Sequence, residues 1–125
     1  MKKLSLFFLL AAFIFINSCS QENVSGGGGG VTGTPAPPSN LSATVISSTQ
    51  ANLTWKDNSS NENGFIIERK MFSNSYVIIA TTGPNVVTYL DMGLISATDY
   101  TYRMTSYNTT GGSSAYSLEV MITTP

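Results

Sequence analysis

Short stretches in which apolar and polar residues alternate recur from residue 39 to residue 125, and clusters of Gly, Asn, Ser and Pro separate them. Alternation with a period of two is typical of β-strands, which place successive side chains on opposite faces. No segment of this region shows the period and capping residues of a helix. The pattern predicts an all-β fold, a sandwich of two sheets built from seven short strands. The predicted strands lie at residues 41–45, 51–55, 65–68, 76–80, 86–90, 100–106 and 116–122.

Several segments also carry linked motifs in a recognisable order. They resemble the second and third strands, the fifth strand with its turn, the tyrosine-corner segment with the sixth strand, and the last-strand opening of bacterial fibronectin type III domains. These segments are residues 53–59, 62–69, 89–94, 94–108 and 112–117. The resemblance covers nearly all of residues 39–125 and implies the seven-stranded immunoglobulin-like sandwich of that family.

Two aromatic side chains fit this architecture. Trp55 is the only tryptophan and lies on the apolar row of its strand, so we expect it to fill the space between the sheets. Tyr100 falls at the tyrosine corner that the resemblance implies, with a buried ring and a hydroxyl bonded to nearby backbone. Ser96 and Met104 replace the Pro and Val that are usual in the family, which loosens a turn and softens the core. We expect neither to change the fold.

The first residues predict export from the cytoplasm. Lys2 and Lys3 precede an apolar run at residues 4–16, and small or polar residues follow it. A basic start, a short apolar run and small residues before a cut are typical of a secretory signal peptide. The run is shorter than the roughly twenty residues that a membrane-spanning helix needs. Residues 16–19 resemble the lipobox of bacterial lipoproteins in a looser, Bacteroidetes-like form, in which Asn17 is the departure.

Cys19 is the only cysteine and ends this lipobox-like stretch. The resemblance implies that residues 1–18 are removed and that the Cys19 thiol carries a lipid, which would anchor the protein in the bacterial outer membrane, facing the periplasm or the cell surface. Cleavage that leaves a free thiol and an uncleaved anchor are the alternatives. An unpaired exposed thiol is a liability in an oxidising compartment, which favours a modified Cys19.

A linker joins this anchor to the domain. Residues 19–38 include the unbroken glycine run 26–30 and the proline cluster 35–38. Glycine tracts behave as random coil, and prolines stiffen the chain into an extended form. The glycine run lacks the Lys-Ser or Lys-Thr pair that follows in a phosphate-binding loop. We therefore expect a flexible tether that ends where the domain, residues 39–125, begins.

Charge and residue types exclude several function classes. From Cys19 onward the chain has four basic and seven acidic side chains, so it offers no basic surface for nucleic acid. It has no histidine, the commonest general base and a frequent metal ligand. Most carboxylates fall at turns or alternate outward on strands, and no base accompanies the Ser and Thr residues at a recognisable spacing. We find no catalytic residues and expect neither an enzyme nor a cofactor.

The stretch 57–64 offers oxygen ligands at alternating positions, as a calcium loop does. Its glycine is misplaced and no bidentate glutamate follows at the right distance. Asn, Ser and Asp also gather in such stretches because they turn the backbone. We therefore favour a structural turn, with calcium as the alternative, and predict no metal site.

The outer face of the sheet that holds the third, sixth and seventh strands is the best candidate for a binding surface. Tyr and Arg are enriched at binding hot spots. The alternative is that these residues form cross-strand pairs that only stabilise the sheet. The loop 108–113 is a second candidate, since its glycines favour mobility. Alternation directs these candidate residues outward: Ile66, Glu68, Lys70, Arg103 and Tyr107, with Thr101 and Thr105 beside them.

These observations predict a non-catalytic, membrane-tethered lipoprotein with one fibronectin type III module that mediates protein–protein interaction or assembly in the cell envelope. The alternative is a carbohydrate-directed accessory or adhesion module on the cell surface, because similar modules accompany secreted glycan-degrading enzymes. An exposed aromatic platform would favour the alternative, and Tyr107 with Tyr116 is too small to form one. The expected partners are the membrane, through the lipid on Cys19, and a protein or a glycan.

Overall fold

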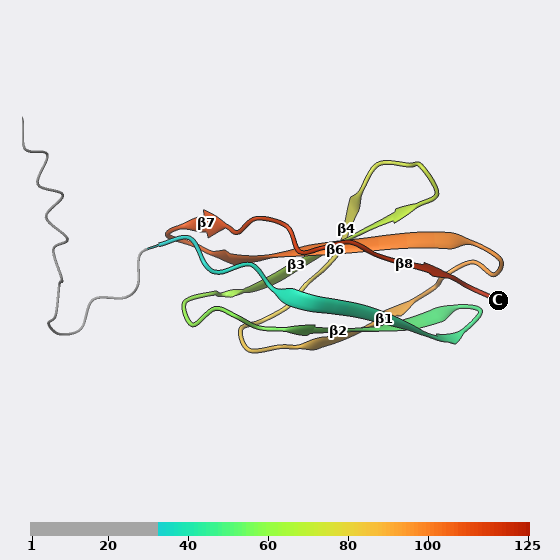
Figure 1. Ribbon diagram of the computed structural model, residues 1–125, viewed down its shortest axis with the longest axis horizontal. Coiled ribbons are helices and arrows are strands. Elements are labelled where there is room, and N and C mark those ends of the chain that lie inside the picture. Colours follow the sequence, from blue (N-terminus) through green and yellow to red (C-terminus); the bar gives the residue numbers. More distant parts are fainter. Residues whose placement is uncertain (1–32) are drawn as a thin grey trace, which may run out of the picture.

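The computed structural model describes residues 33–125, which form two antiparallel β-sheets packed face to face (Figure 1). The first sheet has the order β1-β2-β5 and consists of β1 (Ser39–Ser47), β2 (Gln50–Lys56) and β5 (Thr88–Met92). The second has the order β4-β3-β6, with β7 and β8 both paired to β6. It consists of β3 (Gly64–Met71), β4 (Val77–Thr81), β6 (Asp99–Asn108), β7 (Gly112–Ser113) and β8 (Val120–Thr123). The predicted all-β sandwich is confirmed.

The predicted signal peptide, Cys19 and the glycine run lie outside the described residues. Within residues 33–125, no helix is long and apolar enough to cross a membrane.

The last predicted strand is interrupted, which gives eight strands where seven were expected. Only its second half forms β8, and β7 lies before the break. Between the two, the Ser114 and Ser117 hydroxyls accept hydrogen bonds from the backbone N–H groups of Ser106 and Met104, at 3.0 and 3.2 Å. These side chains supply acceptors to β6 where regular strand pairing is missing, so the edge of the sheet stays hydrogen-bonded through the break.

The core lies between the sheets and follows the alternation of the strands. The rings of Trp55 from β2 and Phe65 from β3 meet edge to face, with centroids 5.5 Å apart. Both are buried, which confirms that Trp55 fills the space between the sheets. Met104 is fully buried in the same core. The other buried apolar residues are Ala51, Leu53, Ile67, Leu94, Tyr100, Tyr102 and Ile122.

The last six residues of the predicted linker, 33–38, lie against one end of the sandwich. The side-chain amide of Asn108 donates to the Gly33 carbonyl at 3.0 Å, and that of Asn58 donates to the Pro37 carbonyl at 2.9 Å. The Ser106 hydroxyl donates to the carbonyl of Ala36 at 2.7 Å. The chain therefore enters the sandwich at the end formed by the β2–β3 and β6–β7 loops, and residue 125 lies at the opposite end (Figure 1).

Candidate functional site

The predicted binding surface lies on the outer face of β3 and β6. The register places Glu68 directly opposite Arg103, and Arg103 Nε lies 2.7 Å from Glu68 Oε2. Ile66 faces Thr105, which is buried, and Lys70 faces Thr101. The structure thus joins Glu68 to Arg103 as a cross-strand pair, the alternative that was weighed against binding.

Tyr107 lies apart from this pair. It is opposite Gly64, four residues along β6 from Arg103 and therefore about 13 Å away along the strand. The loop that follows Tyr107 packs against the entering chain, because the Thr34 hydroxyl donates to the Gly111 carbonyl at 3.1 Å. The loop proposed as a second candidate is therefore held at the end where residues 33–38 lie.

Two tyrosines complete the cluster around Arg103. Its guanidinium lies 3.8 Å from the ring centroids of both Tyr76 and Tyr116, so it is in stacking range of two rings. The Tyr116 hydroxyl donates to Glu68 Oε1 at 3.2 Å, and the Lys70 ammonium lies 4.7 Å from the Tyr76 centroid. Burial, with a smaller contribution from the Glu119 carboxylate, raises the pKa of Tyr76 to about 12. Tyr76 was not among the residues predicted for this surface, because nothing in its local pattern shows that it turns toward β6.

A second arginine points the other way, into the space between the sheets. Arg69 Nη1 lies 2.7 Å from Asp91 Oδ2 and 2.9 Å from Oδ1, which joins β3 to β5 in the opposite sheet. The Tyr102 hydroxyl donates to Asp91 Oδ2 at 2.8 Å, and the Tyr100 ring centroid lies 5.1 Å from the guanidinium. This inner network of Arg69, Asp91, Tyr100 and Tyr102 ties three strands together.

Burial and the Asp91 carboxylate together shift the pKa values of Tyr102 and Arg69. Burial, reinforced by the hydrogen bond to Asp91, raises the pKa of Tyr102 well above its usual value, so its hydroxyl stays a donor. Burial alone would lower the pKa of Arg69, but the hydrogen bond and charge of Asp91 more than offset it and raise that pKa. The carboxylate thus has a cation on one side and a neutral hydroxyl on the other.

Most carboxylates were expected to be solvated, and Asp91 is an exception. It is almost fully buried because β5 turns Tyr89 and Asp91 inward, which leaves Leu90 and Met92 exposed. Apolar residues occupy both rows of β5, so alternation alone could not decide which row faces the core. The available signal was Arg69, a cation in the inward row of β3, since a buried cation requires a counter-ion.

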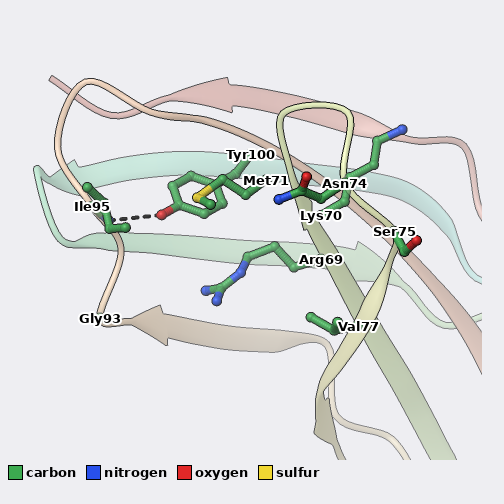
Figure 2. Close-up of a pocket in the computed structure, with 9 residues that line it drawn as sticks. All are labelled: Arg69, Lys70, Met71, Asn74, Ser75, Val77, Gly93, Ile95 and Tyr100. Atoms are coloured by element: carbon green, nitrogen blue, oxygen red, sulfur yellow. Dashed lines mark hydrogen bonds between the residues drawn. The ribbon is translucent and has the colours of Figure 1, made fainter.

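The tyrosine corner is present as expected. The Tyr100 hydroxyl accepts a hydrogen bond from the Ile95 backbone N–H at 2.9 Å, and the Tyr100 ring is buried. The same two residues line a pocket of about 320 Å³ between the β3–β4 hairpin and the turn that follows β5 (Figure 2). Arg69 and Met71 also line it, and Val77 lies at its β4 side.

The stretch considered as a calcium loop forms a turn. Asp57 Oδ1 accepts the Ser59 backbone N–H at 2.9 Å, and the Ser59 hydroxyl donates to Asn61 Oδ1 at 2.8 Å. Asn58 and Asn61 donate to the entering chain. No group of three or more His, Cys, Asp or Glu that could hold a metal ion occurs in residues 33–125. These contacts favour the structural turn.

Comparison with known proteins agrees with this architecture. The sequence model of the family described as the fibronectin type III domain matches residues 36–123. The chain belongs to the fibronectin type III family. Its match begins inside the predicted linker, at the residues that pack against the sandwich. Fibronectin type III domains are typically non-catalytic modules, and many unrelated roles are built on such folds.

Individual proteins with similar segments include two with fibronectin type III domains and one enzyme. The crystal structure of an Fn3-like protein from Clostridium thermocellum is 31% identical, with a TM-score of 0.61, and the match covers 74% of this chain and 95% of that chain. The FN1–FN3 domains of chicken CNTN1 are 26% identical with a TM-score of 0.65, over 74% of this chain and 33% of that chain. An alpha-amylase from Niallia circulans is 36% identical over 94 residues. That match covers 75% of this chain but 7% of the amylase.

Proposed function

We propose that the chain is a lipoprotein whose fibronectin type III domain is a non-catalytic module that binds a protein partner in the bacterial cell envelope. A lipid on Cys19 would anchor it in the outer membrane, and the residues between Cys19 and Gly33 would connect anchor and domain. The basic start, the short apolar run and the lipobox-like stretch support this anchor.

The protein-binding part of this proposal rests on the difference between the two ends of the domain. Residues 33–38 are held at one end by side-chain amides and a serine hydroxyl, so the chain from Cys19 arrives there. At the other end, the β3–β4 hairpin and the turn after β5 carry three exposed apolar side chains, Phe72, Val77 and Ile95, and the last two line one pocket. Exposed apolar surface is typical of sites of protein association. A tether at one end and an apolar surface at the other suit a module that is presented to a partner.

Two measurements test this proposal. A Cys19→Ala variant should leave the membrane fraction, because the lipid is the expected anchor, and a variant that stays there would refute the lipoprotein interpretation. Protease treatment of intact cells carrying a C-terminally tagged protein, with a periplasmic marker as control, then reports the orientation. Loss of the tag indicates the cell surface, and survival until lysis indicates the periplasm.

A carbohydrate-directed accessory module is the second candidate, and the similarity to a segment of an alpha-amylase favours it. Arg103 occupies one ring face of Tyr76 and one of Tyr116, so Tyr116, which is half-exposed, is the main stacking surface left. Affinity electrophoresis in gels containing soluble starch tests this candidate. Retardation that disappears in a Tyr116→Ala variant would support it, and unretarded migration would reject starch as the ligand.

A further inference from the structure

We propose that the pocket between the β3–β4 hairpin and the turn after β5 receives an acidic side chain from an extended segment of a protein partner, and that this segment pairs with β4 as an added strand. The inference rests on the proposed protein-binding function and identifies its surface and the chemistry that it recognises.

The first step is the open edge of β4. β3 is the only strand that pairs with β4 among the described residues, so β4 ends its sheet. Edge strands are usually protected by charged residues or prolines, because their free backbone groups can pair with another chain. β4 has the sequence Val-Ile-Ile-Ala-Thr and contains neither. Val77 and Ile78 are exposed on it. This edge therefore suits β-strand addition, in which main-chain hydrogen bonds supply affinity.

The second step is the unused hydrogen-bonding capacity of Arg69. Its Nη1 atom bonds both oxygens of Asp91, and within residues 33–125 no acceptor contacts its Nε or Nη2. Its guanidinium points toward the turn that carries Gly93 and Ile95, whereas the Lys70 ammonium points away (Figure 2). The Nε–Nη2 edge of a guanidinium matches a carboxylate in a bidentate fork. The pocket thus offers a fixed receptor for one carboxylate.

The third step is the balance of charge. Asp91 compensates the charge of Arg69, so a carboxylate would be held by directed hydrogen bonds more than by net attraction. Such bonds are strong only where water is excluded. Met71, Val77, Ile95 and Tyr100 provide apolar walls. The matching segment therefore carries an acidic residue with apolar residues two positions before and after it, because side chains two positions apart lie on the same face of an added strand and would cover these walls.

These features favour a segment of another protein over the other occupants. A free small carboxylate would lack the main-chain hydrogen bonds that β4 offers. Two copies of this chain paired through β4 would place Val-Ile-Ile-Ala-Thr against the same strand, which contains no acidic residue to enter the pocket.

Titration of the ¹⁵N-labelled full chain in detergent micelles with defined peptides tests the proposal. The probe is a capped hexapeptide, Val-Thr-Glu-Thr-Val-Thr, in which both Val side chains share the face of the Glu, with its Gln counterpart as the matched control and acetate as the small-carboxylate arm. We expect amide shifts in β4, at Arg69 and at Ile95, with the Glu peptide at least about tenfold tighter than the Gln peptide. The inference is overturned if the Glu and Gln peptides bind with equal affinity, or if acetate alone produces the same amide shifts. It is also overturned if the shifts lie only in other parts of the domain, or if the highest soluble peptide concentration produces none.

Two exposed positions provide matched variants. Ile95→Glu places a negative charge at the mouth of the pocket and should weaken the Glu peptide about tenfold or more. Leu118→Glu makes the same change away from the pocket and should leave the affinity unchanged; the residues are 58% and 89% exposed, so both variants should fold. Equal effects would refute the site. The two proposals fail separately. If the peptide binds but the Cys19→Ala variant stays in the membrane fraction, only the lipoprotein interpretation is overturned. If Cys19→Ala leaves the membrane fraction but the peptide does not bind, only this inference is overturned.

Discussion

Glu68 and Arg69 are neighbours on β3, and each belongs to an arginine–carboxylate pair. The two pairs differ in their surroundings. Both pairs have a shortest N–O distance of 2.7 Å. The outer pair, Glu68–Arg103, links adjacent strands of one sheet, whereas the inner pair, Arg69–Asp91, links the two sheets. The carboxylate side chain is 15% exposed in the outer pair and 4% exposed in the inner pair.

The contrast shows that equal geometry does not mean equal contribution to stability. An ion pair that water can reach gains little, because hydration replaces most of what the partner supplies. A carboxylate removed from water depends on its partners, and loss of one leaves a buried charge uncompensated. We therefore expect the inner pair to hold the sheets together. The outer pair can be rearranged with little loss of stability.

The largest effect is expected for Asp91→Asn. The neutral amide cannot balance the charge of the partly buried Arg69 guanidinium or accept from both neighbours as the carboxylate does. We expect the free energy of unfolding to fall by about 3 kcal/mol. Urea denaturation measures the loss, and Glu68→Gln is the matched control. If both substitutions have the same effect, burial does not distinguish the two pairs.

Tyr102→Phe should have the next largest effect. It removes one of the two donors to the buried Asp91 Oδ2, which keeps Arg69 Nη1, and a hydrogen bond to a charged group contributes about 1.5–3 kcal/mol. Burial raises the pKa of the native Tyr102 above that of the unfolded chain, so its stabilisation is present below about pH 10 and decreases as pH rises beyond that value. Urea denaturation over alkaline pH should show a slope that Tyr102→Phe reduces. An unchanged slope would assign the alkaline loss to other groups.

Tyr100→Phe should have a smaller effect of about 1 kcal/mol, because the Ile95 N–H loses its acceptor while the ring stays beside Arg69. Differential scanning calorimetry gives the shift in melting temperature. Hydrogen exchange at the Ile95 amide provides an independent measure and should become faster. A melting temperature that does not change would show that this hydrogen bond adds nothing to stability.

The same contrast explains how far the sequence could predict the molecule. Alternation and turn residues were sufficient for the sandwich and for buried Trp55, and the resemblance to family motifs predicted the tyrosine corner at Tyr100. The pairing of Glu68 with Arg103 was weighed in advance, because alternation places both on one face. In each case the local pattern contained the relevant information.

The features that were missed depend on contacts between distant segments. Asp91 lies inside because Arg69 from the other sheet and Tyr102 meet it there, which no local pattern of β5 encodes. Tyr76 joins Arg103 only through the course of the β3–β4 hairpin. Residues 33–38 resemble a free linker in composition, yet asparagine amides from the β2–β3 loop and from the end of β6, together with a serine hydroxyl of β6, fix them. Composition describes a segment in isolation and cannot report such partners.

The smallest effect is expected for the outer pair, and it bears on function. A double-mutant cycle with Glu68→Gln and Arg103→Met should give a coupling free energy below about 1 kcal/mol that decreases further at high salt. Arg103 also stacks on Tyr76 and Tyr116, so its single substitution should exceed the coupling through lost packing. A coupling free energy as large as the loss of stability in Asp91→Asn would mean that the residues of this face mainly stabilise the fold. A weak coupling leaves Glu68, Lys70 and Arg103 able to exchange their internal partners for those of a bound protein.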